Sequence, residues 1–153
     1  NIGDVGIHSQ IKGPYKTNSF IPFHKLTLWM TYSCLDFLEK QGSKVYNWQK
    51  LPGLSEYRNG GLFLDLGVLE LKDHTALNES HKSTSELVVE WRALSLCLLD
   101  LLLEKVQEKT QDKSFTLAML LEGGTWRAGR RIAKNLREDG SPPLRISLEG
   151  SMF

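Results

Sequence analysis

A long amphipathic helix, predicted over residues 84–110, constrains the fold of this chain more than any other sequence feature. Apolar residues recur along it at helical spacing and form a wide stripe: Leu87, Trp91, Leu94, Leu98, Leu101, Leu102 and Val106. The stretch Ser83-Thr84-Ser85-Glu86 has the pattern of a capping box at the start of this helix. A stripe of this width is typical of a helix that other elements cover. We therefore predict a mainly α-helical bundle with this helix buried at its centre.

Shorter helical patterns lie on both sides of the long helix. Residues 23–40 present an apolar face, followed by the stop signal Gly42; the face consists of Leu26, Trp29, Met30, Phe37 and Leu38. Further helices are predicted at residues 61–71, at 115–122 after a cap at Ser114, and from Thr125 onward. Gly129 within the last of these indicates close packing against another element. The remaining stretches are predicted as loops or connectors (1–23, 45–54, 72–82) and as an extended strand or tail (144–148).

Length, charge and cysteine content limit the class of protein. The 153 residues suffice for one domain with a hydrophobic core, and a net charge of +1 gives no general attraction for nucleic acid or an acidic membrane. No segment approaches the length of a transmembrane helix. Cys34 and Cys97 fall in separate apolar helical patterns, which predicts buried, reduced thiols in a cytoplasmic protein. We expect one helical domain over residues 1–153, and the non-Met first residue suggests a piece of a longer polypeptide.

A charged cluster at residues 56–61 leads directly into an apolar segment. Glu56, Tyr57, Arg58 and Asn59 precede two glycines and then the run Leu62-Phe63-Leu64. One interpretation is a functional site at the mouth of a helix, since sites are often built where polar groups meet an apolar wall. The other is an ion-paired turn in which Glu56 and Arg58 neutralise each other. The residues alone leave both open.

Two further carboxylates occur among apolar residues. Asp65 lies between Leu64 and Leu66, and a buried carboxylate requires a partner, for which Arg58 is the nearest candidate. Glu90 and Arg92 flank Trp91 in the long helix. They are interpreted either as part of a site or as an internal salt bridge that stabilises the helix.

Cationic residues are expected at two helix starts. His24 and Lys25 lie in the first turn of the 23–40 helix, where the macrodipole disfavours cations, so they either face an anionic group or lie exposed at a frayed end. Thr125 follows Gly123-Gly124 and precedes Arg127, Arg130 and Arg131. A helix that starts at Thr125 would offer free backbone N–H groups to a phosphate or carboxylate; the alternative is an amphipathic surface helix.

Several blocks together resemble the uracil-catabolism protein four family. The blocks cover residues 23–26, 56–69, 86–93 and 122–126, and the tail at 140–153 is also similar. The resemblance implies that this chain corresponds to the C-terminal half of longer proteins. It also implies a role in a pyrimidine degradation route in which the uracil ring is opened while still attached to ribose phosphate. The expected step is hydrolysis of the N-glycosidic bond of a ribosylurea, with release of urea.

A fainter similarity links the chain to the queuosine-nucleotide N-glycohydrolases. Those proteins carry an Asp-Tyr-Arg block, then Leu-Gly-Val-Leu, then a helix with Glu-x-x-x-Arg-Ala, and residues 56–58, 66–69 and 89–93 look like a variant of this order. Glu56 stands where the aspartate would be. This similarity implies a helical fold like that of DNA glycosylases.

The resemblance implies roles for a defined set of residues. A carboxylate would stabilise the positive charge that develops on the ribosyl group, and this role falls to Glu56, with Glu90 or Asp65 on ribose hydroxyls. The expected substrate-binding residues are Tyr57, Arg58, Asn59, Arg92, His24, Lys25, Thr125, Trp126 and Arg127, of which Thr125, Arg127 and Lys25 would hold a 5′-phosphate. We expect a small ribosyl or phosphoribosyl substrate, no metal or other cofactor, no nucleic-acid or membrane partner, and contact with a missing N-terminal half. The alternatives are a non-catalytic helical module that binds a nucleotide or a partner chain, and a packing half whose chemistry resides in the missing N-terminus.

Overall fold

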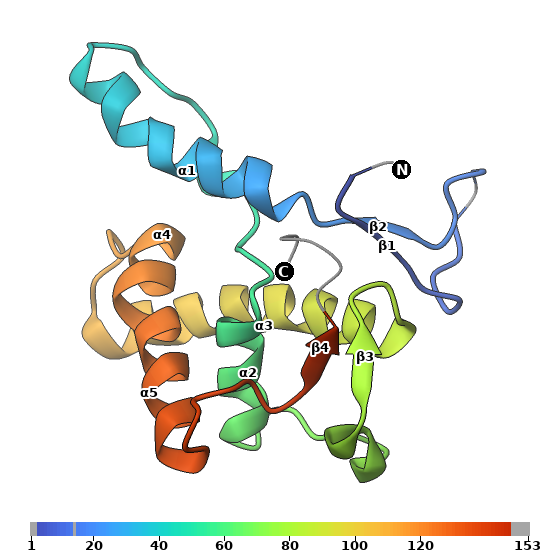
Figure 1. The fold of residues 1–153 in the computed structure, drawn as a ribbon. Coiled ribbons are helices and arrows are strands. Elements are labelled where there is room, and N and C mark those ends of the chain that lie inside the picture. The colour runs from blue at the N-terminus through green and yellow to red at the C-terminus, as the bar shows by residue number, and fades with distance from the viewer. Residues whose placement is uncertain (1–2, 14, 148–153) are drawn as a thin grey trace.

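Three helices form the centre of the computed structural model, which describes residues 3–13 and 15–147. The longest, α3 (Glu86–Thr110), crosses the molecule, and α2 (Tyr57–Asp65) contacts both α3 and α5 (Trp126–Leu136) (Figure 1). The prediction of a mainly helical protein is confirmed. The long helix predicted at residues 84–110 is also confirmed, apart from two residues at its start.

Glycines set how closely these helices approach one another. A Cβ atom on Gly60 of α2 would lie 2.6 Å from the Ser95 hydroxyl of α3. A Cβ on Gly129 of α5 would overlap the carbonyl oxygen of Arg58 in α2. Gly129 was predicted to pack closely against another element, and the structure confirms this. α2 can therefore lie against two helices at once because each crossing has a residue without a side chain.

Two clusters of buried apolar side chains form the core. One lies between α2, α3 and the segment before α5, and consists of Phe63, Leu99, Leu120 and Leu121. The other lies where the C-terminal segment passes α3, and consists of Ala76, Trp91 and Leu144. The buried residues of α2 therefore fix the position of its N-terminal end, where the charged cluster begins.

The segment before α5 differs from its prediction. Thr116 caps α4 (Leu117–Met119) by accepting a hydrogen bond from the Met119 amide at 3.3 Å, whereas Ser114 was expected to cap. The chain then continues without a break through a π-helical segment (Leu120–Thr125) into α5. Thr125 therefore has helical backbone angles inside a continuous helix and makes no side-chain cap bond, so no free helix start follows it. The Gly123-Gly124 pair lies inside this π segment and does not end the helix.

Short strands occur where loops were predicted. β1 (Val5–Ile7) pairs antiparallel with β2 (Phe20–Pro22), with Val5 opposite Pro22. Residues 72–82 contain a 3₁₀ turn (His74–Asn78) and β3 (Ser80–Lys82), which pairs in parallel with β4 (Arg145–Ser147). The extended segment predicted at residues 144–148 thus corresponds to β4, and residue 148 lies outside the described residues. These strands attach both ends of the described chain to the helical core.

Helix starts are the other places where the predicted boundaries fail. α2 was expected over residues 61–71. It begins one turn earlier, at Tyr57 after the N-cap Glu56, and ends at Asp65. The capping box at residues 83–86 is not formed. Ser85 is the N-cap of α3 without a side-chain cap bond, and the Glu86 carboxylate instead accepts a hydrogen bond from the backbone N–H of Ser9 at 2.7 Å.

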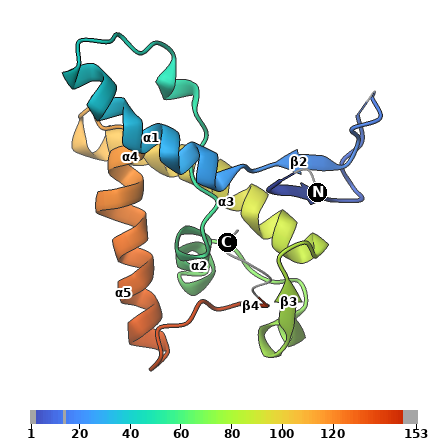
Figure 2. The same ribbon diagram turned by 45° about the horizontal axis from the view of Figure 1, so that its top comes forward.

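α1 (Lys25–Lys40) projects from the helical core, with a 3₁₀ turn (Trp48–Lys50) in the segment that returns from it (Figure 1, Figure 2). Its apolar residues Leu26, Met30 and Phe37 are all exposed. The two thiols, Cys34 on α1 and Cys97 on α3, are free but also exposed, so the prediction of buried thiols is wrong. Within residues 3–13 and 15–147, no helix combines the length and apolar character needed to cross a lipid bilayer.

Candidate functional site

A pocket of about 570 Å³ lies between α1, the start of α2 and the segment that leads into α5. Its lining combines aromatic, amide and carboxylate side chains from these three elements: Trp29, Tyr32, Ser33, Asp36, Leu54, Glu56, Asn59, Ala118, Leu121, Glu122 and Trp126. This pocket is called the α1–α2 pocket below. Among the described residues that line it, none is Lys or Arg. Its charged groups are therefore the carboxylates of Asp36, Glu56 and Glu122.

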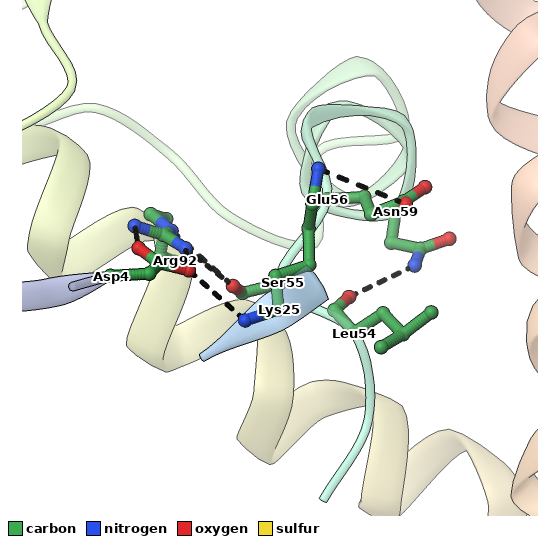
Figure 3. A network of polar contacts seen from close by, with 7 residues as sticks. All are labelled: Asp4, Lys25, Leu54, Ser55, Glu56, Asn59 and Arg92. Carbon is green, nitrogen blue, oxygen red and sulfur yellow. Dashed lines mark hydrogen bonds and ion pairs between the residues drawn. The ribbon is translucent and has the colours of Figure 1, made fainter. Parts of the chain in front are cut away.

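Glu56 is the N-cap of α2 and reaches the pocket from the charged cluster identified in the sequence. Its carboxylate lies 4.0 Å from the ammonium group of Lys25, and its side chain is 21% exposed (Figure 3). The sequence left open whether Glu56 pairs with Arg58. It does not, because Arg58 donates from Nη1 to the carbonyl oxygen of Gly140 at 2.8 Å. Glu56 is thus held at the pocket by a cation from α1.

Lys25 is unusually buried for a lysine, with a side chain that is 9% exposed. Burial lowers the pKa of Lys25 and the nearby charge of Arg92 lowers it further, although Glu56 and Asp4 act in the opposite direction. Of the two interpretations that the sequence left open for Lys25, the structure agrees with the one in which it faces an anionic group, which is Glu56. His24, by contrast, is exposed and adopts a left-handed conformation as the N-cap of α1.

A second ion pair supports the Lys25 end of the pocket. Arg92 donates to both carboxylate oxygens of Asp4, at 2.7 and 2.8 Å, and also donates to the Ser55 hydroxyl at 3.0 Å (Figure 3). Asp4 in turn accepts the backbone N–H of Lys25 at 3.1 Å. The Arg92–Asp4 pair therefore links α3, the residue that precedes Glu56, and the first turn of α1. Glu90 was expected as a possible salt-bridge partner of Arg92, but Asp4 takes that place.

Burial alone would raise the pKa of Asp4, but the hydrogen bonds from Arg92 and from the Lys25 amide, with the charges of both residues, hold it below its ordinary value. Arg92 also lies over the ring of Phe23, with its guanidinium carbon 3.9 Å from the ring centre. The guanidinium therefore has a carboxylate along its edge and an aromatic ring on its face, which is the geometry that arginine favours.

Asn59 and Thr125 form a buried link between the two walls of the pocket. The Thr125 hydroxyl donates to the side-chain oxygen of Asn59 at 2.9 Å, and the Asn59 amide group donates to the carbonyl oxygen of Leu54 at 3.1 Å. Both residues are at most 3% exposed. Asn59 lines the pocket, whereas Thr125 acts through Asn59 and holds the π-helical segment, with Glu122, against the start of α2.

The other two predicted catalytic carboxylates lie elsewhere. Asp65 accepts two hydrogen bonds from Arg137, at 2.8 and 2.6 Å, so Arg58 is not its partner. Glu90 is on α3, with its carboxylate half exposed and 3.8 Å from His8. Neither residue lines the α1–α2 pocket. The structure thus separates Glu56 from the two acidic residues that were expected to work beside it.

The remaining predicted binding residues divide into one that lines the pocket and three that do not. Trp126 lines the pocket and has the guanidinium of Arg130 over its ring at 5.0 Å. Tyr57 packs against the cluster around Trp91, and Arg58 lies over the Tyr57 ring. Arg127 is exposed on α5. The described residues therefore do not form the predicted phosphate-binding site at Thr125 and Arg127. The helix is continuous there, and the Thr125 hydroxyl already donates a hydrogen bond to Asn59.

Sequence reasoning missed several residues of this region. Glu122 stands in a sequence block that was noted for its glycines and Trp126, but its carboxylate was not considered. Trp29 was predicted only as part of an apolar helix face and Asp36 was not singled out, although their spacing of seven residues places them on one face. Asp4 gave no local signal, apart from the need of a buried Arg92 for a counter-ion.

The pocket offers carboxylates and aromatic surfaces to a ligand. Among the described residues, no group of three or more His, Cys, Asp or Glu side chains could hold a metal. A wall of tryptophan with carboxylates at its edges suits a polyhydroxyl ring, because the ring stacks on the indole while its hydroxyls donate to the carboxylates. A carboxylate in such a pocket can also stabilise positive charge on the bound ring.

Comparisons with known proteins place the chain in a family. Residues 1–153 match a family model described as "Protein of unknown function (DUF1688)". The chain is 43% identical over 159 residues to Protein urg3 of Schizosaccharomyces pombe, an alignment that covers 100% of this chain and 38% of that protein. It is 41% identical over 154 residues to Uracil catabolism protein 4 of Lachancea kluyveri, covering 89% of this chain and 35% of that protein. The chain thus spans little more than a third of these relatives. No solved structure matches it.

Proposed function

The chain belongs to the DUF1688 family, and from its similarity to Uracil catabolism protein 4 and the chemistry of its pocket we propose that it hydrolyses an N-glycosidic bond in uracil catabolism. The proposed substrate is a ribosylurea, and the products are ribose and urea. The single observation that carries this proposal is the position of Glu56, a carboxylate held by Lys25 at an aromatic-walled pocket.

The reaction needs one group above all others. As the bond between the ribosyl C1′ and the urea nitrogen breaks, positive charge develops on the sugar, and a fixed carboxylate beside it lowers the energy of the transition state. In this proposal Glu56 is that carboxylate and accepts a proton from the attacking water. The water oxygen bonds to C1′, and the proton taken from the water ends on the leaving urea nitrogen.

The other lining residues have supporting roles in the proposal. Trp29 and Trp126 contact the apolar face of the sugar, and Asp36 and Glu122 accept hydrogen bonds from its hydroxyls. Lys25 does not touch the substrate and fixes the orientation of Glu56. Asp65 and Glu90 have no part, because neither lines the pocket.

The charge of the pocket favours an unphosphorylated ribosyl group. A 5′-phosphate carries negative charge and is normally bound by Arg, Lys or free backbone N–H groups. The described lining has three carboxylates and no Lys or Arg, and Lys25 beside it is already paired with Glu56. We therefore propose ribosylurea rather than its phosphate as the substrate. The fold resemblance to DNA-glycosylase-like N-glycohydrolases remains part of this proposal.

The test compares two conservative variants of a family-length polypeptide that contains residues 1–153. Glu56→Gln keeps the size of the side chain but removes the charge, so turnover of ribosylurea is expected to fall by about 10²- to 10⁴-fold. Glu90→Gln is the matched control, since Glu90 lies on the same chain outside the pocket, and its turnover is expected to stay within about twofold. Urea release from synthetic ribosylurea is the measurement. Unchanged turnover in Glu56→Gln would refute the catalytic role.

A further inference from the structure

An exposed apolar stripe runs along α1 on the side next to the pocket. Leu26, Met30 and Phe37 are 47%, 64% and 64% exposed, and their spacing of four and seven residues places them on one face of the helix. We call these three residues the α1 stripe. We propose that the α1 stripe is covered by the flanking part of the family polypeptide, meaning the part that lies outside residues 1–153.

The first support is the way in which α1 is attached. Its first residue, Lys25, anchors it, since the backbone N–H of Lys25 donates a hydrogen bond to the Asp4 carboxylate and its ammonium group pairs with Glu56. Further along, Tyr32 donates to the carbonyl oxygens of Leu51 and Pro52, which belong to the segment that returns from α1. Figure 1 shows the rest of the helix standing away from α2 and α3. A 16-residue helix held mainly at one end and exposing its apolar face needs another surface to pack against.

The second support is the length of polypeptide available to provide that surface. The chain spans 38% of Protein urg3 and 35% of Uracil catabolism protein 4, so each relative has more residues outside the matched region than inside it. In such a polypeptide the flanking part is tethered to this region, so its local concentration is high. A tethered partner of this kind is the occupant that the observations favour over a second copy of the chain.

The third support is continuity with the pocket. Trp29 lies on α1 one turn from Leu26, lines the pocket and is 58% exposed, and Trp126 on the opposite wall is 38% exposed. A segment packed on the α1 stripe would therefore also border the open side of the pocket. Covering the stripe would hold α1 against the pocket and remove water from its rim.

Cys34 provides a natural probe of this contact. It lies on α1 between Met30 and Phe37 and is exposed, and the other cysteine of the chain, Cys97, is exposed on α3. The experiment measures the alkylation rate of each thiol, by peptide mass spectrometry, in the native family-length polypeptide and in the same polypeptide unfolded in urea. We expect Cys34 to be protected at least about tenfold in the native form, because reaction then requires local opening.

Three substitutions on α1 make the result specific. Phe37→Glu places a charge in the α1 stripe and is expected to abolish most of the Cys34 protection, whereas Lys40→Glu at the exposed end of the same helix is expected to preserve it. The milder Phe37→Ala should give an intermediate loss, and the circular dichroism spectrum of each variant reports whether the rest of the protein is folded. Cys34 that reacts as fast in the native as in the unfolded polypeptide would overturn the proposal. If Cys34 loses its protection when the polypeptide is diluted until it is monomeric, a second copy covers the α1 stripe. That result would also overturn the proposal.

Discussion

Arg92 donates to both carboxylate oxygens of Asp4 at 2.7 and 2.8 Å, although 88 residues separate them in the sequence. The guanidinium is 4% exposed, and it also donates to the hydroxyl of Ser55, the residue before Glu56. This one pair therefore joins the start of the described chain to α3 and to the proposed catalytic carboxylate. Removal of this pair is expected to lower the stability of the fold mainly, and to disturb the position of Glu56 at the pocket to a smaller extent.

The substitution Asp4→Asn tests the strength of this pair. It leaves the buried guanidinium without its carboxylate, and we expect the free energy of unfolding to fall by roughly 3–5 kcal/mol. Urea denaturation followed by circular dichroism measures the change. Glu39→Gln on α1 is the control, since Glu39 is exposed and its substitution should shift the free energy by less than about 0.5 kcal/mol. Equal midpoints for Asp4→Asn and Glu39→Gln would show that the pair contributes nothing net.

The same pair predicts a defined dependence of stability on pH. The pKa of Asp4 in the folded protein lies below the unfolded value, taken as 3.8, so the folded state binds this proton more weakly than the unfolded state does. The resulting stabilisation is present in full above the unfolded pKa and is lost as the pH falls through the folded pKa. We expect the free energy of unfolding to decline from about pH 5 toward about pH 2.5, and to decline less in Asp4→Asn. Parallel curves for the two proteins would contradict the assignment.

Two glycines in neighbouring helical segments provide a second stability test. A Cβ on Gly129 would overlap the carbonyl oxygen of Arg58, whereas a Cβ on Gly123 would meet no atom within 4 Å. Gly129→Ala is expected to destabilise the protein by roughly 1–3 kcal/mol through overpacking. Gly123→Ala, in an open helical position, is expected to be neutral or to stabilise by up to about 1 kcal/mol. Thermal unfolding distinguishes the two, and a similar response from both would refute the close crossing of α2 and α5.

The parts of the fold that depend on local pattern were predictable from the sequence. The stripe of α3 and the close packing at Gly129 follow from spacing within one segment. Glu56 lies at the N-terminal end of α2, in agreement with one of the two interpretations that the residues left open. What the residues did not indicate is which distant groups meet there.

The failures share a physical cause, which is that ion pairs were assigned to near neighbours in the sequence. Asp65 pairs with Arg137 across α2 and the end of α5, and Arg92 pairs with Asp4 from the opposite end of the chain. A second cause is the double glycine before Thr125, which normally ends a helix but here lies inside a continuous π segment. The exposed apolar face of α1 was missed for a different reason. An apolar pattern predicts that a helix face is buried, but it does not identify the surface that covers that face.

The Thr125–Asn59 hydrogen bond, at 2.9 Å, leads to a prediction that separates positioning from packing. Thr125→Val keeps the shape of the side chain but removes the hydroxyl, and leaves the Asn59 oxygen short of a buried donor, at a cost of roughly 1–3 kcal/mol in the free energy of unfolding. Thr125→Ser keeps the hydroxyl and loses only a methyl group, so it should cost about 1 kcal/mol.

Because this bond holds the π segment against the start of α2, the two variants should also differ in turnover of ribosylurea at temperatures where both are fully folded. We expect a decrease of about tenfold or more in kcat for Thr125→Val, with the Ser variant within about threefold of the unmodified family-length polypeptide. Urea release and the melting curve are measured on the same preparations. If the Val variant loses stability but retains kcat, Thr125 only packs the helices together. It then has no role in positioning the two pocket walls that carry Glu122 and Glu56.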